Sequence, residues 1–325
     1  MKKDIIQKKA VTTTPVPKDG SDWIIDGATT PIMLDESAEA EMAPDFTTWQ
    51  KFCNIFKHNK LALISLIVIL IIIIVSIGAP IFAPYDPNAQ DFSLSLAKPS
   101  AQHLLGCDKL GRDVLSRMIY GGRISIMIGF LPTIVSMVLG TVLGITAGFV
   151  GGRTDTIIMR IADICMAFPS LLLAMVVSYT IGTGFLTIFL ALSFVSWAGT
   201  ARVVRSEVLA LREKEYVEAA TSIGVKKWTI MLRHIFPNCM PTLIVMMTNN
   251  IPGNILTESS LSFLGIGAQP PDTSWGLLVY QTKAYLQRNP AITLAPGVAI
   301  LILVVAFNFL GDAVRDALDP ALKDQ

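Results

Sequence analysis

Long segments without a charged residue alternate with short polar segments over most of the chain. Five of them reach the length of about 20 residues that an α-helix needs to cross a bilayer. They span residues 61–85, 124–152, 164–201, 234–257 and 289–311. The third is long enough for two helices and contains Gly182-Thr183-Gly184, a turn signal that divides it. The pattern predicts six membrane helices, at about residues 61–83, 124–149, 157–180, 185–205, 237–261 and 291–312.

The polar segments set the remaining boundaries. Residues 1–45 show no sustained period and cannot bury enough apolar surface to fold, so we predict a disordered cytoplasmic tail. In residues 46–60, aromatic side chains recur at helical spacing between lysines. This predicts an interfacial amphipathic helix or, equally, the first turns of the membrane helix that follows. We further predict an extracellular loop at 84–123, a helical core at 124–312 with a cytoplasmic loop at 206–233, and a cytoplasmic C-terminus at 313–325.

Composition places the chain in the membrane. Hydrophobic residues make up 52% of the sequence and charged residues 16%, whereas soluble domains contain about a quarter charged residues. The expected fold is therefore an all-α polytopic membrane protein. The net charge of +1 provides no basic surface for nucleic acid. Lysine and arginine are concentrated in the segments that would be cytoplasmic if both termini are cytoplasmic, so we predict that orientation. The loop at 84–123 is locally basic and runs against this rule, but long loops carry less weight in setting the orientation.

The cytoplasmic loop at 206–233 contains a stretch of strong helix formers. Glu213, Glu215 and Glu218 precede Gly224 and two lysines follow it, which is the charge order that complements a helix dipole. Glycine commonly ends a helix in the left-handed conformation, so we expect a short helix that ends at about Gly224. On periodicity alone, such a helix is more often an ordinary solvated loop helix than a docking site.

A polar stripe runs along the fifth predicted crossing. Asn250, Asn254, Glu258 and Ser262 follow a four-residue spacing and therefore share one face. Amide and carboxylate groups are costly against lipid, so this face should contact the bundle interior, a partner subunit or a wet cavity. Two interpretations are open: Asn250, Asn254 and Glu258 line or gate a pathway near its outer end, or they form hydrogen bonds between helices that hold a dimer together.

Four blocks of sequence resemble the permeases of ABC importers. Their cytoplasmic signature, Glu-Ala-Ala, three residues, Gly, nine residues and Ile-x-Leu-Pro, here reads Glu218-Ala219-Ala220, Gly224 and His234-Ile235-Phe236-Pro237. His and Phe depart from the last block, and the histidine resembles the oligopeptide and dipeptide branch. The other blocks lie at residues 105–117, 262–271 and 307–320. The chain thus resembles a C-type subunit of the oligopeptide, dipeptide and nickel family.

This resemblance implies a type I importer bundle and a docking role for the short helix. The implied ATPase-coupling residues are Tyr216, Glu218, Ala219, Ala220 and Gly224. The implied partners are a second homologous permease, an extracellular solute-binding protein and two cytoplasmic ATPase subunits, which bind ATP and Mg²⁺. The implied cargo is an oligopeptide or dipeptide, with nickel or another small solute as the alternative. The implied location is the bacterial cytoplasmic membrane.

The sequence contains no evident catalytic centre. It has no Gly-x-x-x-x-Gly-Lys-[Ser/Thr] loop, so ATP hydrolysis must be supplied by other chains. His58, His103 and His234 are far apart in the predicted topology, and the four cysteines have no metal-ligand spacing. We therefore predict no catalytic, cofactor or metal residues, which disfavours a membrane-embedded enzyme. A self-sufficient secondary transporter is an alternative of another class, but it predicts an internal repeat, and none is visible.

Overall fold

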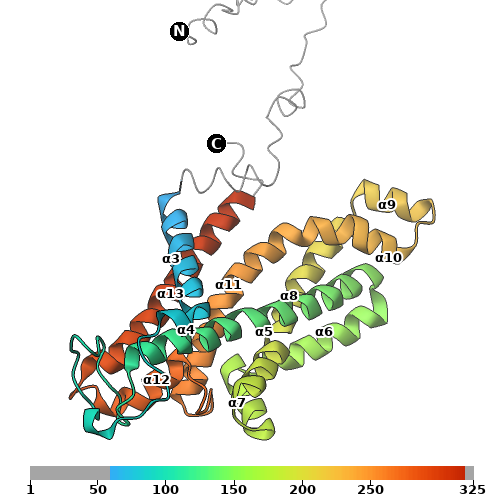
Figure 1. Ribbon diagram of the computed structural model, residues 1–325. Coiled ribbons are helices and arrows are strands. Elements are labelled where there is room, and N and C mark those ends of the chain that lie inside the picture. Colours follow the sequence, from blue (N-terminus) through green and yellow to red (C-terminus); the bar gives the residue numbers. More distant parts are fainter. Residues whose placement is uncertain (1–58, 319–325) are drawn as a thin grey trace, which may run out of the picture. The chain divides into compact units, whose positions relative to one another are not determined.

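The computed structural model describes residues 59–318. In these residues every regular element is a helix, apart from one isolated bridge between Cys107 and Asp113 (Figure 1). The predicted tail at 1–45 lies outside the described residues. So do nearly all of the amphipathic segment at 46–60 and the end of the C-terminal segment at 313–325.

Five helices among the described residues are long and apolar enough to cross a membrane, and a sixth crossing is present if the bent pair α6 and α7 counts as one span. The longer helices are α3 (Lys60–Ile77), α5 (Val114–Val150), α6 (Gly152–Ala167), α7 (Ser170–Ile181), α8 (Phe185–Arg212), α11 (Phe236–Phe263) and α13 (Pro290–Leu318). Short segments connect them: α4 (Ala79–Phe82), η1 (Phe92–Leu94), α9 (Glu215–Ser222), α10 (Lys227–Ile230), η2 (Met231–Ile235), α12 (Trp275–Thr282) and η3 (Lys283–Tyr285). This is the predicted all-α polytopic fold.

Helix α5 starts earlier than the sequence predicted, so part of the expected extracellular loop is helical. Asp113 caps its first turn by accepting a hydrogen bond from the Ser116 amide at 2.7 Å. Arg117 and Arg123 made the start of α5 resemble a loop in the sequence, but in the structure both arginines have partners. Arg117 is buried against Asp108, and Arg123 donates to backbone carbonyls at the end of α3. Charge counting failed here because it takes no account of partners.

The predicted third crossing at 157–180 is two helices rather than one. α6 and α7 meet in a 90° bend at Phe168 and Pro169. A residue before proline is sterically excluded from the helical region, and Phe168 has extended angles of φ −101° and ψ 141°. Helix α6 is also amphipathic, and its Asp155 forms an ion pair with Arg205 of α8. The bend and the charges explain why this segment is not a single straight membrane helix.

Helices α5 and α8 pack closely along their length. The contact face of α5 carries Gly140, Gly144 and Gly148, which repeat at helical spacing. A Cβ added at Gly144 would lie 2.7 Å from the carbonyl oxygen of Ala201 and 2.9 Å from Cβ of Val204. No larger side chain fits at this distance without moving the backbone. The pair therefore forms a close-packed support for the loop at residues 206–233.

The stretch at residues 84–113, here called the outer segment, is held by a buried ionic network. Asp108 accepts hydrogen bonds from Nε of Arg112 at 2.8 Å and from Nη1 of Arg117 at 2.7 Å. Arg117 also donates through Nη2 to Gln281 of α12 at 3.1 Å. These bonds explain the charged block that begins at residue 105: its charges neutralise one another inside the protein and join the outer segment to α5 and α12.

A large apolar core joins α3, α11, α12 and α13. Its buried members are Ile69, Ile251, Ile255, Trp275, Leu278, Ile300, Leu303, Ala306 and Phe307. The indole of Trp275 also donates to the carbonyl of Met118 in α5 at 2.8 Å. Helices α3, α11 and α13 are therefore packed together, and α12 closes one end of this core.

Candidate functional site

Helix α9 lies between α8 and α10 and ends as the sequence predicted. Gly224 has φ +79°, which is the left-handed region that favours glycine. The Val225 amide donates to the carbonyl of Ala220 at 3.1 Å and the Gly224 amide to that of Thr221 at 3.0 Å. This pair of bonds is the Schellman arrangement, which satisfies the last carbonyls of a helix. Gly224 therefore reverses the chain and returns it to the membrane through α10.

One side of α9 is packed against its own chain. Val217 is 1% exposed and Ala220 is 9% exposed, whereas Tyr216, Glu218 and Ala219 are exposed. The two adjacent alanines of the signature therefore differ in environment. Ala219 presents a small surface to the outside, and Ala220 lets α9 approach the bundle.

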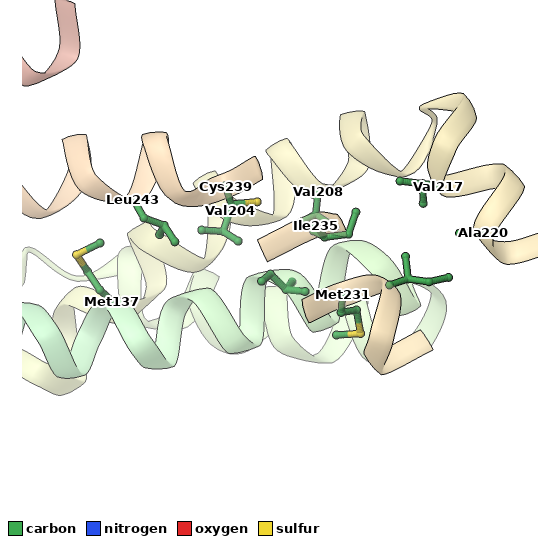
Figure 2. Packing of buried hydrophobic residues seen from close by; sticks show 11 residues of the cluster. Met137, Val204, Val208, Val217, Ala220, Met231, Ile235, Cys239 and Leu243 are labelled. Atoms are coloured by element: carbon green, nitrogen blue, oxygen red, sulfur yellow. The ribbon is translucent and has the colours of Figure 1, made fainter. Parts of the chain in front are cut away.

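The buried side of α9 belongs to an apolar core that reaches deep into the membrane helices (Figure 2). Val217 and Ala220 are in one cluster with Val208 of α8, Met137 of α5 and Leu243 of α11. The remaining buried members are Ile145, Val204, Ile230, Met231, Ile235 and Cys239. The buried side of α9 is therefore continuous with the close-packed interior of the membrane helices.

The outward side of the same region carries apolar residues that its own chain leaves uncovered. Ile223, in the turn after α9, is 80% exposed. Trp228 of α10 is 65% exposed and lies at an apolar groove that residues of α5 and α11 also line. Exposed aromatic and aliphatic side chains beside a polar rim are typical of a protein interface. The sequence reasoning did not select Trp228; the signal available was a tryptophan directly after two lysines in a loop predicted to be cytoplasmic.

His234, where the signature departs from its usual isoleucine, lies against α9. Its ring is 6.2 Å from the ring of Tyr216, between centroids. Asn238 donates to the Tyr216 hydroxyl at 3.5 Å and to the His234 carbonyl at 2.6 Å. This contact joins α9 to the start of α11 through η2, a single π-helical turn, a form that often occurs at functional sites.

A cleft of about 640 Å³ lies behind α9. Its lining residues are Phe149, Arg212, Glu213, Glu218, Thr221, Val225, Lys227 and Ile230. Glu218 therefore contributes to the wall of a cleft that also contains basic groups. The cleft therefore leaves the Glu218 and Thr221 side of α9 without close packing against the bundle.

The polar stripe on α11 is largely turned toward its own chain. Asn254 is buried and donates through Nδ2 to Thr133 Oγ1 of α5 at 2.8 Å. Glu258 is fully buried and accepts a hydrogen bond from Ser262 at 2.7 Å. Asn250 is half-buried. The bond made by Asn254 thus joins two helices of one subunit, and the pathway role of the three residues stays a prediction.

Titratable groups gather mainly at the two ends of the bundle. Within residues 59–318 there is no cluster of three or more His, Cys, Asp or Glu side chains placed to hold a metal ion. Nδ1 of His103 lies at hydrogen-bond distance, 2.9 Å, from Oδ1 of Asp113 in the outer segment, whereas His234 lies beside α9. The structure does not bring these two histidines together.

Two family models match the chain. Residues 140–324 match the model described as binding-protein-dependent transport system inner membrane component. Residues 47–99 match the N-terminal TM domain of oligopeptide transport permease C. The first match covers the α9 region and the polar stripe.

Individual proteins agree with the family models. The glutathione transport system permease protein GsiD of Pectobacterium atrosepticum is 39% identical over 91% of this chain and 96% of its own length. The oligopeptide transport system permease protein OppC of Bacillus subtilis is 39% identical over 88% of this chain and 94% of its own. A chain of the inward-facing MetNI methionine ABC transporter is similar in fold, with a TM-score of 0.54 and 17% identity over 63% of this chain and 97% of that one.

The chain therefore belongs to the inner membrane components of binding-protein-dependent transport systems, which are the permeases of bacterial ABC importers. The resemblance to C-type oligopeptide and dipeptide permeases, drawn from four short blocks, is confirmed over most of the sequence.

Proposed function

We propose that this chain is the C-type permease of an ATP-driven importer of oligopeptides or dipeptides, with both termini in the cytoplasm. The cargoes named for two relatives, glutathione and oligopeptides, support a peptide cargo. The chain forms half of the translocation pathway and pairs with a second homologous permease. An extracellular solute-binding protein delivers the peptide. Nickel or another small solute is the competing cargo.

The observation that carries this proposal is the two-sided environment of α9. Its inner side, Val217 and Ala220, belongs to the core of the membrane helices. Beside its outer side, Ile223 and Trp228 are exposed apolar residues. A helix built in this way is suited to receive a partner on one side and to transmit the partner's movement through the other.

In the proposed mechanism this chain performs no chemistry. Two cytoplasmic ATPase subunits bind ATP and Mg²⁺ and dock on the outer side of α9. The proposed docking residues are Tyr216, Glu218, Ala219, Ile223 and Trp228, while Gly224 forms the turn and Ala220 anchors α9 to the bundle. Closure of the ATPases displaces α9, and the shared core shifts α5, α8 and α11, so that the pathway alternates between its two openings.

We place the polar residues of α11 on or beside the pathway. Asn250, Asn254 and Glu258 lie toward the outer half of the helix, where their hydrogen-bonding groups either contact the peptide or control the opening. The single buried hydrogen bond from Asn254 to Thr133 joins α11 to α5, and its making and breaking offers a two-state contact for such a gate.

Reconstitution into liposomes tests the proposal. The full chain is co-expressed with the neighbouring transport genes, purified through a tag and reconstituted with the solute-binding protein outside and ATP inside. The expected result is co-purification of ATPases and ATP-dependent uptake of labelled dipeptide or oligopeptide. Uptake of Ni²⁺ without peptide would replace the cargo, and uptake driven by an ion gradient without ATP or ATPases would reject the importer class.

A further inference from the structure

Helices α8 and α11 are the two arms that carry the α9 region, and a polar bond joins their side chains. Thr242 of α11 donates through Oγ1 to Oε1 of Glu207 in α8 at 3.0 Å. The thiol of Cys239, near the start of α11, also lies against the carboxyl group of Glu207, so two polar side chains of α11 face this acid. The bond lies beside the apolar core that contains Val208 and Leu243, the residues that follow Glu207 and Thr242 in sequence.

Glu207 is half-buried, and its two carboxylate oxygens are unequally satisfied. Its Oε2 atom is buried and has no hydrogen-bond partner among the described residues. The arginines of α8 do not compensate it: Arg202 and Arg205 pair with acids of α6 on another side of the helix. Replacing both partners of a hydrogen bond with apolar groups of the same shape can be nearly neutral for stability. Stability alone therefore does not account for an acid at this position.

A hydrogen bond and an apolar contact differ in how strictly they fix the relative position of two helices. Apolar contacts are non-directional, so α8 and α11 can slide along one another and keep most of their buried area. A hydrogen bond is sensitive to distance and angle and therefore fixes the relative position of the two helices. Glu207 and Thr242 lie close to the cytoplasmic ends of their helices, between α9 and the middle of the bundle.

We propose that Glu207 is a positioning residue for energy coupling, because its bond with Thr242 makes the two arms move as one body when α9 is displaced. This inference rests on the proposed importer function. Without the bond, a push on α9 separates or slides the arms, and part of the displacement does not reach the pathway. ATP hydrolysis then continues while less peptide is transported per ATP.

Matched substitutions distinguish coupling from folding. Thr242→Val and Glu207→Leu remove the bond with little change in volume, whereas Thr242→Ser and Glu207→Gln retain a donor and an acceptor. Thr257→Val is the control, since Thr257 on the same helix bonds only to the carbonyl of Gly253 in its own helix. Peptide uptake and ATP hydrolysis are measured in the same reconstituted complex, and their ratio is compared with wild type.

The expected result is a fall in peptide transported per ATP of roughly two- to tenfold for Thr242→Val and Glu207→Leu, the range that the loss of one buried hydrogen bond allows. Thr242→Ser, Glu207→Gln and Thr257→Val should keep the wild-type ratio. An unchanged ratio in the first pair would overturn the proposal. A proportional loss of uptake, hydrolysis and assembled complex would also overturn it, since a purely structural bond predicts that outcome.

A distance measurement does not depend on transport or on the cargo. Bio-orthogonal labels are placed at Val203 of α8 and Ile244 of α11, which are both partly exposed. In the purified full chain, Thr242→Val should broaden the distribution of distances between the labels, and Thr257→Val should not. Equal widths in all three proteins would contradict the proposal even if the importer function itself were established. Absence of uptake by wild type, with the expected broadening, would instead count against the proposed function alone.

Discussion

The outer segment and the α9 region are both built from sequence blocks of the same family, but they use their residues in opposite ways. In the first, buried Asp108 holds the guanidinium of Arg117 of α5, which is 1% exposed and also donates to Gln281 of α12. In the second, Ile223 is exposed although it is apolar. A block whose charges are buried together holds its own chain in one arrangement, whereas a block that exposes apolar residues offers a surface to another protein.

The largest effect should follow from breaking the outer network. Asp108→Asn leaves Arg112 and Arg117 without a negative partner in a buried site. Loss of one partner from such a site costs about 3–5 kcal/mol. We expect a marked fall in the unfolding temperature and in the amount of protein in the membrane, measured by thermal unfolding in detergent and by immunoblotting. Asp86→Asn, on the exposed surface of the same segment, should be close to wild type; equal stability of both variants would show that the network is not what holds the segment.

The two signature alanines give a sharper version of the comparison. Ala220→Leu inserts atoms into a packed core and should destabilise the chain itself by about 1–3 kcal/mol. Ala219→Leu adds the same atoms on the exposed side, so the unfolding temperature should stay near wild type while ATPase binding weakens. Thermal unfolding of the purified chain and titration with ATPase subunits separate the two effects. The reverse order of stabilities would mean that α9 packs with its other side inward.

Glu258 tests whether the membrane helices contain a residue that acts on a transported molecule rather than only holding its own chain together. Glu258→Gln keeps the size and most hydrogen bonds of the side chain, including the acceptor for Ser262. Assembly of the complex should therefore be unchanged, while peptide uptake in proteoliposomes should fall if the group lies on the pathway. Wild-type uptake by this variant would reject the pathway role and leave Glu258 with a purely structural one.

The smallest effect concerns the thiol in the outer segment. Burial, together with the carboxylates of Asp113 and Asp108, raises the pKa of Cys107 to about 11. The folded protein thus retains this proton above the ordinary thiol pKa. The stabilisation from the neutral thiol is complete below about pH 9 and is lost as the pH rises toward 11. At pH 8, N-ethylmaleimide should leave Cys107 unmodified and label a cysteine introduced at exposed Ala101, as read by peptide mass spectrometry; rapid labelling of Cys107 would contradict its burial.

The sequence was sufficient to predict those helices whose evidence lies within one continuous segment of the chain. Continuous apolar length predicted α3, α8, α11 and α13, and one glycine with its flanking charges predicted the end of α9. The start of α5 was missed because Arg117 and Arg123 resemble loop residues until their partners, Asp108 and the end of α3, are known. Helix propensity and composition contain no information about such distant partners.

The site shows the same limit more clearly. Ala219 and Ala220 are adjacent and chemically identical, so no property of the sequence distinguishes the buried one from the exposed one. That difference depends on how α9 docks on the bundle. Similarly, the spacing of Asn254 predicted that it avoids lipid, but only the fold identifies Thr133 as its partner. Sequence patterns therefore indicated how these residues are spaced along their helices, whereas the contacts of each one depend on the fold.

The central claim is that the exposed side of the α9 region receives an ATPase while its buried side moves the membrane helices. The most direct test is the affinity of the purified full chain, paired with its second permease, for the ATPase subunits, with Ile223→Ser compared with wild type. We predict a loss of at least about tenfold in affinity, as for an interface hot spot, with an unfolding temperature within error of wild type. Wild-type affinity and wild-type uptake in Ile223→Ser, together with those of Trp228→Ser, would contradict the account.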